Sequence, residues 1–467
     1  MKNKNSIYLA LLGLLIHAAC HQESSSTFVT HAPTPTFCHQ DWFPHSQTPN
    51  PKEGDGSTFD TNSTTMSIFH EWAWQKFLWL TRPATNNKAL FEQQLILVND
   101  VVAPIPTHLD NNGNTIPLVL LADSQAGKDS MGILISNPNF NTQGISDTVY
   151  YAIYVDSSFF KTAQTMRKAI RQDTSKLNND YTFPIGAMEV KTSWIKAEVI
   201  PSELRSKYYI TKAYFPNKNS VAEVALLGMH IASVVKNHPE FIWATFEHQE
   251  LAPIYPWPNT KTSQDIPVTV EKEFLLFRKG DTSTINNLQK QDSFQSVFAV
   301  YQYGIPITQQ DTFLETSQRE PQNYNHINSV NACVKSNLKD EWSNYFYNGA
   351  VWLKTDKLSP QQQVDTINSL AKKLGNFSKP SIARGSANAS NITMETFQQV
   401  KKEAHAIHNI DVNLLKNCFS CHHATMRTKQ NTFQSPLYIS HIFKKSLKDS
   451  LPLSAKEQEN IQGFISQ

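Results

Sequence analysis

The sequence lacks the patterns by which many nucleotide-dependent and hydrolytic enzymes are recognised. It contains no phosphate-binding glycine loop, no Rossmann glycine fingerprint and no nucleophile elbow, and glycine itself is scarce, at 15 of 467 residues. The net charge is only +2 and no run of Lys or Arg stands out, so nothing in the sequence predicts nucleic-acid binding. Beyond the N-terminus, no apolar run approaches the length of a membrane-spanning helix.

Cysteine is also scarce, and two of the 5 cysteines stand in a C-x-x-C-H motif formed by Cys418, Cys421 and His422. This is the attachment sequence for haem c, in which both thiols add to the vinyl groups and the histidine becomes the proximal iron ligand. A chain of this composition would produce roughly 0.002 such motifs by chance. Two alternatives remain, a thioredoxin-like redox pair and half of a zinc site completed by His405 and His408. Because the surrounding segments are predicted to be helical, without the βαβ context of thioredoxin, the motif favours one covalent haem.

The N-terminus predicts export. A short basic region precedes the apolar run Ile7–Ile16, which is too short to span a bilayer, and small residues follow it. Cys20 comes next and resembles the lipidated first residue of mature bacterial lipoproteins. His17 stands where that pattern usually has an apolar residue, so ordinary cleavage to a soluble periplasmic protein is the alternative. The sequence predicts a signal peptide over residues 1–19 and a lipid-anchored tether over residues 20–64, which would attach the protein to a membrane.

Two cysteines remain after these assignments, Cys38 and Cys333. An exported protein resides in an oxidising compartment, where a leftover pair is expected to form a disulfide. The alternative is two separate buried thiols, because a sequence does not show the distance between them.

The pattern of apolar residues predicts an α+β fold. Consecutive strands joined by short polar turns indicate an antiparallel, β-rich central body, either a sheet or a sandwich, with flanking helices over residues 65–380. A helical C-terminal, cytochrome c-like haem segment is expected over residues 381–467. The expected strands are Thr148–Val155, Gly186–Glu198, Lys207–Phe215, Ser220–Val235, Phe241–His248 and Glu271–Arg278. The expected helical regions are Thr65–Leu80, Ser157–Gln172, Asn287–Leu353, Ser359–Leu374, Thr393–His408, Leu437–Lys448 and Ser454–Phe464.

Several of these stretches, taken together and in order, resemble a family of exported bacterial proteins described as cytochrome c-like. The matching stretches are Trp72–Leu80, Glu189–Trp194, Tyr208–Ala213, Leu227–Ile231, Phe241–His248, Thr393–Phe397 and the C-x-x-C-H motif. The resemblance implies that a β-rich body and a helical haem segment form one unit. It implies no particular reaction.

The sixth position of a haem iron decides between electron transfer and ligand chemistry. No methionine follows Met426, which is too close to His422 in sequence to reach the opposite face of the haem. The expected candidates for the sixth ligand are, in order, His441, Met394, His230, and then His405 or His408.

A second hypothesis concerns the β-rich body. His230 lies in one expected strand, and Glu247 and His248 lie in its neighbour, so the three could form a metal or catalytic site; a hydrogen-bonded pair is the simpler alternative. The favoured function is a periplasmic electron carrier for an unidentified redox partner protein. The alternatives are a haem-containing oxidoreductase or metal-dependent enzyme, and a lipoprotein in which haem mainly stabilises a small helical segment.

Overall fold

The computed structural model describes residues 38–60, 66–110, 112–120, 133–256, 266–284, 287–288, 293–300, 321–353, 358–359, 361–363, 365–367, 383–386, 390–396, 418–427 and 431–447. The predicted signal peptide, the lipidation site Cys20 and residues 20–37 and 61–64 of the expected tether lie outside these ranges. The described part of that tether, residues 38–60, is packed against the body, with Trp42 and Thr48 buried. So do His405, His408 and the helix expected over Ser454–Phe464. Within the described ranges, no helix has the length and apolarity needed to cross a membrane.

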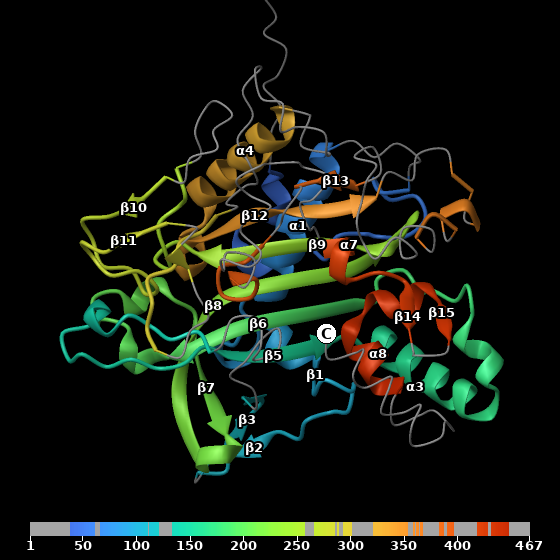
Figure 1. Cartoon of the computed structure of the whole chain (residues 1–467), viewed down its shortest axis with the longest axis horizontal. Helices are drawn as coiled ribbons and strands as arrows, with labels where there is room; N and C mark the ends of the chain where they lie inside the picture. Colours follow the sequence, from blue (N-terminus) through green and yellow to red (C-terminus); the bar gives the residue numbers. More distant parts are fainter. Residues whose placement is uncertain are drawn as a thin grey trace, which may run out of the picture. The chain divides into compact units, whose positions relative to one another are not determined.

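A nine-stranded sheet forms the centre of the protein, with the strand order β1-β5-β6-β8-β9-β12-β13 (Figure 1). Strand β8 is long enough to pair with β9 over one half and with β7 over the other, and β4 pairs with β7. Every pairing is antiparallel except that of β4 with β7, so the predicted antiparallel sheet is confirmed. The strands are β1 (Ile96–Val98), β4 (Leu118–Val119), β5 (Tyr150–Val155), β6 (Met188–Lys196), β7 (Ile210–Phe215), β8 (Ser220–Val235), β9 (His238–His248), β12 (Tyr345–Leu353) and β13 (Ala383–Gly385).

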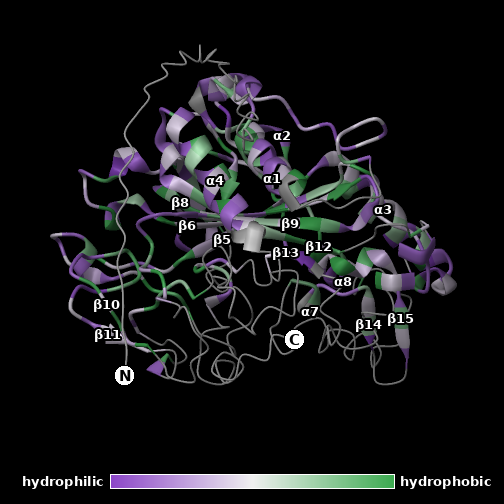
Figure 2. Cartoon of the chain, turned by 90° about the horizontal axis from the view of Figure 1, so that it is seen from above, coloured by the Kyte–Doolittle hydropathy of each residue, from purple (hydrophilic) through white to green (hydrophobic). Residues whose placement is uncertain are grey.

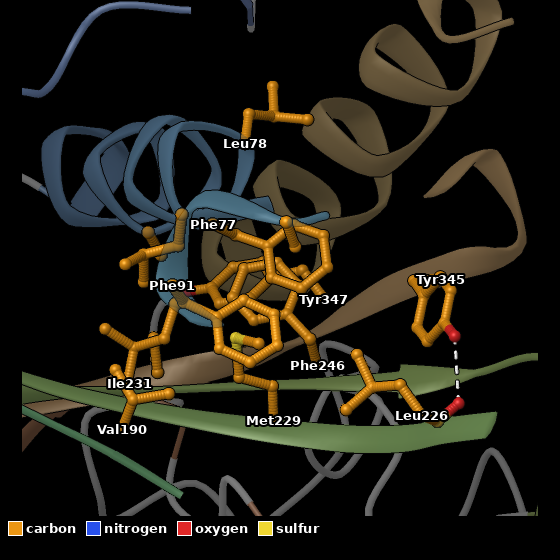
Figure 3. Packing of buried hydrophobic residues seen from close by; sticks show 14 of the residues in the cluster. Phe77, Leu78, Phe91, Val190, Leu226, Met229, Ile231, Phe246, Tyr345 and Tyr347 are labelled. Carbon is orange, nitrogen blue, oxygen red and sulfur yellow. Dashed lines mark hydrogen bonds between the residues drawn. The ribbon is translucent and has the colours of Figure 1, made fainter. Parts of the chain in front are cut away.

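Helices α1 (Met66–Thr81), α2 (Leu90–Gln94) and α4 (Pro321–Asn337) lie on one side of this sheet, and α7 (Cys418–Cys421) lies on the other (Figure 2). Helix α1 is apolar almost all round because it is buried between the sheet and α4. Phe77 of α1 stacks on Phe246 of β9, with ring centroids 4.0 Å apart (Figure 3). The side chains that meet here form the first core, which holds the helices against the sheet.

One cation is buried beside this first core. Lys76 of α1 lies 3.0 Å from the carboxylate of Glu53, and both side chains are almost fully shielded from solvent. Trp72 and Ser233 also donate hydrogen bonds to this carboxylate, at 2.8 and 3.3 Å. A buried charge is tolerated only when it is paired and hydrogen-bonded, as Glu53 is here.

The opposite face of the sheet carries two further cores with polar side chains between them. The second core includes Leu227 and Met394 and packs under the described segments around residues 133–145, 251–256, 266–284 and 293–300. The third core includes Phe159 of α3 (Ser157–Gln172) and Phe443 of α8 (His441–Leu447). Asp156 caps α3 by accepting hydrogen bonds from two amides of its first turn. Period-2 alternation places Met188 and Val190 of β6 in the first core and turns Glu189 and Lys191 to this opposite face.

Three predicted elements are wrong. The helix expected over Thr393–His408 does not begin at Thr393, because the chain forms turns there that are hydrogen-bonded to the sheet, and its residues 397–408 lie outside the described ranges. The helical region expected over Asn287–Leu353 contains α4, but its last nine residues form strand β12. This strand lies between β9 and β13 and is buried on both faces, so its largely apolar and aromatic sequence does not reveal its period. The strand expected over Glu271–Arg278 is a loop closed by one isolated bridge between Phe274 and Phe277, because its apolar side chains cover the second core instead of extending the sheet.

A disulfide joins Cys38 to Cys333 of α4, with Cα atoms 6.0 Å apart at a sequence separation of 295. These are the two cysteines that the haem and lipid assignments leave over. The bridge ties the N-terminal arm to the helical layer beside the first core.

Candidate haem-binding site

The C-x-x-C-H motif lies at the third core. Cys418–Cys421 forms the single turn of α7, and the amide of His422 closes that turn by donating to the carbonyl oxygen of Cys418 at 2.8 Å. Phe419 is buried in the third core and anchors the turn, whereas Cys418 is half-buried. The side chain of Cys421 is outside the described part of the chain. The motif is therefore packed against the body.

The ring of His422 is held from three directions. Its Nδ1 donates to the carbonyl oxygen of Ile439 at 2.9 Å. Trp243 of β9 lies against the ring, with centroids 4.3 Å apart, and His441 stacks on it, with centroids 3.9 Å apart and an interplanar angle of 12°. Burial, assisted by the positive charges of Lys444 and Lys191, lowers the pKa of His422 to about 3, so the ring is neutral.

This arrangement fits an axial ligand of haem iron. A neutral imidazole that donates one N–H to a backbone carbonyl has its other nitrogen fixed as a lone-pair donor, and metal-ligating histidines are typically oriented in this way. Within the described ranges, no side chain or backbone group bonds to Nε2 of His422. The residues present therefore fit a covalently attached haem.

The sheet face beside His422 carries three cross-strand rows, defined by the registers of β6, β8 and β9. Because side chains on one face recur every second residue, successive rows are about 7 Å apart along the strands. The first row is Glu189, Ala232 and Trp243; the second is Lys191, His230 and Thr245; the third is Ser193, Gly228 and Glu247.

The first row supports the motif. Trp243 contacts His422, and at the other end of the row Glu189 accepts a hydrogen bond from Ser440 at 2.8 Å. Ser440 precedes α8, whose first residue is His441. Burial raises the pKa of Glu189, although the bond from Ser440 opposes this change. This row thus fixes both α7 and α8 on the sheet.

The second row contains a histidine–carboxylate pair. Nε2 of His230 lies 2.9 Å from both carboxylate oxygens of Glu395, and the two side chains are 21% and 20% exposed. Lys191 stands opposite His230 in the register. Burial lowers the pKa of Lys191 to about 8, although Glu395 and Glu189 raise it. The second row, next to the row of Trp243, therefore brings basic side chains and a carboxylate together.

The third row fixes the segment that carries Glu395. Asn391 lies over Gly228, where a Cβ atom would come within 2.6 Å of the Asn391 side-chain nitrogen, so glycine permits this close approach. The backbone amide of Asn391 donates to Glu395 at 2.8 Å, and the amide of Ile392 donates to Glu247 at 2.6 Å. Residues 390–396 are thereby held on the sheet, and Glu395 is directed at His230.

The candidates for the sixth ligand are dispersed. His441 lies against His422, whereas Met394 is buried in the second core among apolar side chains. His230 lies one row beyond Trp243, which packs on His422. His405 and His408 lie outside the described residues, so the zinc alternative stays open.

The three residues of the β-body hypothesis do not come together. Glu247 faces the polar rows, whereas His248 lies on the other face of β9, stacked on Tyr208 at 3.6 Å with its Nε2 bonded to the carbonyl oxygen of Lys207. Burial lowers the pKa of His248 to about 3. Across the described ranges, no group of three or more His, Cys, Asp and Glu side chains is arranged to hold a metal ion.

Sequence reasoning missed three residues of this site: Glu395, Lys191 as a site residue, and Trp243 as the contact of His422. Lys191 and Trp243 could have been found from the sequence, because both lie in expected strands and alternate residues of paired strands share the sheet face that carries His230. Glu395 could not, since 165 residues separate it from His230.

Comparison with known proteins adds no assignment. No family model, no curated protein and no solved structure matches the chain.

Proposed function

We propose that this protein is a mono-haem c-type cytochrome that acts in electron transfer, with haem attached through Cys418 and Cys421 and His422 as the proximal ligand. The observation that carries the proposal is the environment of His422. Its ring is neutral, is held by the bond from Nδ1 to Ile439, and follows the two motif cysteines directly. A haem segment over residues 381–467, which forms one unit with the body, belongs to the same proposal. Its described part is not helical throughout, because the hairpin of β14 (Thr425–Arg427) and β15 (Thr432–Gln434) stands between the short helices α7 and α8.

The bound haem would supply reversible one-electron chemistry. The residues of this chain orient the proximal imidazole and shield it. Trp243 and the third core cover part of the ring of His422, and Ile439 fixes which nitrogen is protonated. A protein sets the reduction potential of a haem partly through a low-dielectric environment and a fixed axial ligand.

The role of electron carrier is preferred to that of an enzyme of the β body because His248 faces away from His230 and Glu247. Export to the periplasm and a lipid on Cys20 belong to the proposal too, since haem attachment of this kind occurs outside the cytoplasm. The electron would pass to or from a redox partner protein whose identity is open.

The test is expression with an export signal in a bacterial host that carries the c-type haem maturation system. We expect a haem-stained band that survives denaturing electrophoresis, a mass increase of one haem, and a low-spin spectrum in both redox states. Cys418→Ala combined with Cys421→Ala should remove the stain. His423→Ala is the matched control, because this neighbouring histidine lies outside the motif, and it should retain the haem.

Three results would contradict the proposal. A wild-type protein that stays free of covalent haem, or one that contains equimolar zinc instead, would refute haem binding. A high-spin haem that reacts with peroxide or carbon monoxide would retain haem binding but refute the role of a simple electron carrier.

A further inference from the structure

We propose that His230, held by Glu395, is the second axial ligand of the haem iron. The inference rests on the proposed haem function and names a ligand pair for it. It is carried by the geometry of the three candidates that lie among the described residues: His441, Met394 and His230.

His441 is in the wrong place for this role. Its ring lies parallel to that of His422 at a centroid distance of 3.9 Å, so the two imidazoles are face to face. A second axial ligand must approach the iron from the side opposite the first, and a ring stacked on the proximal ligand lies on the same side as that ligand. His441 therefore supports the ring of His422.

Met394 is also excluded by position. It is 1% exposed and packs in the second core with Ile392 and Leu227, on the far side of the third row from Trp243. Reaching His422 would require the segment 390–396 to leave the sheet, and the hydrogen bonds of Asn391 and Ile392 hold it there.

His230 has the features of a metal ligand. One ring nitrogen, Nε2, is bonded to Glu395, and within the described ranges no other hydrogen bond to the His230 ring is present. Its Nδ1 is therefore available, in the same way that Nε2 of His422 is available. An imidazole with one nitrogen on a carboxylate and the other open is the usual arrangement of a ligating histidine.

The position of His230 suits the second ligand as well. It belongs to the row next to Trp243, which contacts His422, and the sheet and α7 thus bring the two imidazoles to neighbouring places from different elements. His230 is only 21% exposed. The second row itself is polar, with Lys191, His230 and Thr245, and neighbouring residues of the same strands belong to the second and third cores.

Glu395 is a positioning residue in this proposal. The backbone amide of Asn391 donates to one of its oxygens, which fixes the carboxylate, and the carboxylate in turn fixes the ring of His230. A carboxylate bonded to a ligating imidazole increases the electron donation of that ring, which favours ferric iron over ferrous iron. Neutralising Glu395 should therefore raise the reduction potential without removing the ligand.

The experiment uses the full-length holoprotein and records electron paramagnetic resonance and near-infrared magnetic circular dichroism of the ferric state. We expect a low-spin signal from two imidazole ligands in the wild type. His230→Ala should convert the haem to the high-spin form, and added imidazole should restore the low-spin signal. Met394→Ala is the matched control that should keep two imidazole ligands. Glu395→Gln should stay low-spin with a higher reduction potential.

His230→Gln serves as a second variant, because its amide keeps a donor toward Glu395 should alanine prevent folding; it should also become high-spin. A spectrum with two imidazole ligands in both His230 variants, or its loss in Met394→Ala, would overturn the ligand assignment while leaving the haem in place. A wild-type spectrum typical of histidine–methionine ligation would overturn it too. A wild-type protein without covalent haem overturns the proposed function itself, so the two failures are distinguishable.

Discussion

The protonation of Glu247, which belongs to the third cross-strand row, offers a quantitative test of the structure on this face of the sheet. The side chain is 2% exposed, and one carboxylate oxygen accepts hydrogen bonds from Asn348 and from the amide of Ile392, both at 2.6 Å. Burial raises the pKa of Glu247 from 4.5 to about 8, because desolvation outweighs both donors. The native state therefore holds this proton over a pH range in which the unfolded chain has released it.

The sign follows from proton linkage. A carboxyl whose pKa is raised on folding stabilises the native state below its unfolded pKa, and that contribution is lost as the pH rises from 4.5 through about 8. One pKa unit corresponds to about 1.4 kcal/mol of free energy. The difference between the unfolded pKa of 4.5 and the folded pKa of about 8 therefore limits the loss of unfolding free energy to about 5 kcal/mol at and above pH 8. Glutamine has the same shape, carries no titrating proton and retains an oxygen for the donor of Ile392. The side chain of Asn348 contacts Glu247, and its Oδ1 atom, which is buried without a partner among the described residues, can serve as an acceptor for the glutamine amide.

The measurement is the free energy of unfolding in urea for wild type and Glu247→Gln at pH 5, 6.5 and 8. We expect the difference between the two proteins to grow with pH in favour of the glutamine variant. Glu203→Gln, at an exposed position, controls for the change in net charge. A difference that stays constant from pH 5 to pH 8 would refute the assignment of a buried, proton-bearing carboxyl at Glu247.

Two further predictions concern stability. Replacing Cys38 and Cys333 by alanine should lower the free energy of unfolding by about 5 kcal/mol, since the bridge closes a loop of 295 residues in the unfolded chain; guanidinium unfolding checks this, and an unchanged midpoint would contradict it. Lys76→Met should cost about 3 to 5 kcal/mol because it leaves the carboxylate of Glu53 buried without its cation. The double change with Glu53→Gln should recover most of the loss, and a double variant no more stable than Lys76→Met would argue against the pair.

Much of the sheet was readable from the sequence because its strands are long and alternate. In β6, apolar residues at Met188 and Val190 face the helices while Glu189 and Lys191 face the other side, and a period of two reports this directly. Helix α3 was readable because its caps and its apolar stripe are local signals. Strand β12 was not, since a strand buried on both faces carries no alternation.

The proposed attachment site is also local information. The motif places both thiols and the histidine within five residues, so the side chains that are candidates to hold a haem can be named without any knowledge of the fold. The leftover cysteines Cys38 and Cys333 followed by elimination, and the structure joins them.

The surroundings of His422, in contrast, depend on the way distant segments fold together. Its contacts with Trp243 and His441, and the pairing of His230 with Glu395 across 165 residues, arise where a sheet register, a short helix and the segment 390–396 meet in space. Each of these side chains has an ordinary local sequence context. The C-x-x-C-H motif alone thus predicts the chemistry, which is haem attachment. The partners of its histidine are set by packing between distant segments, which no local sequence pattern encodes.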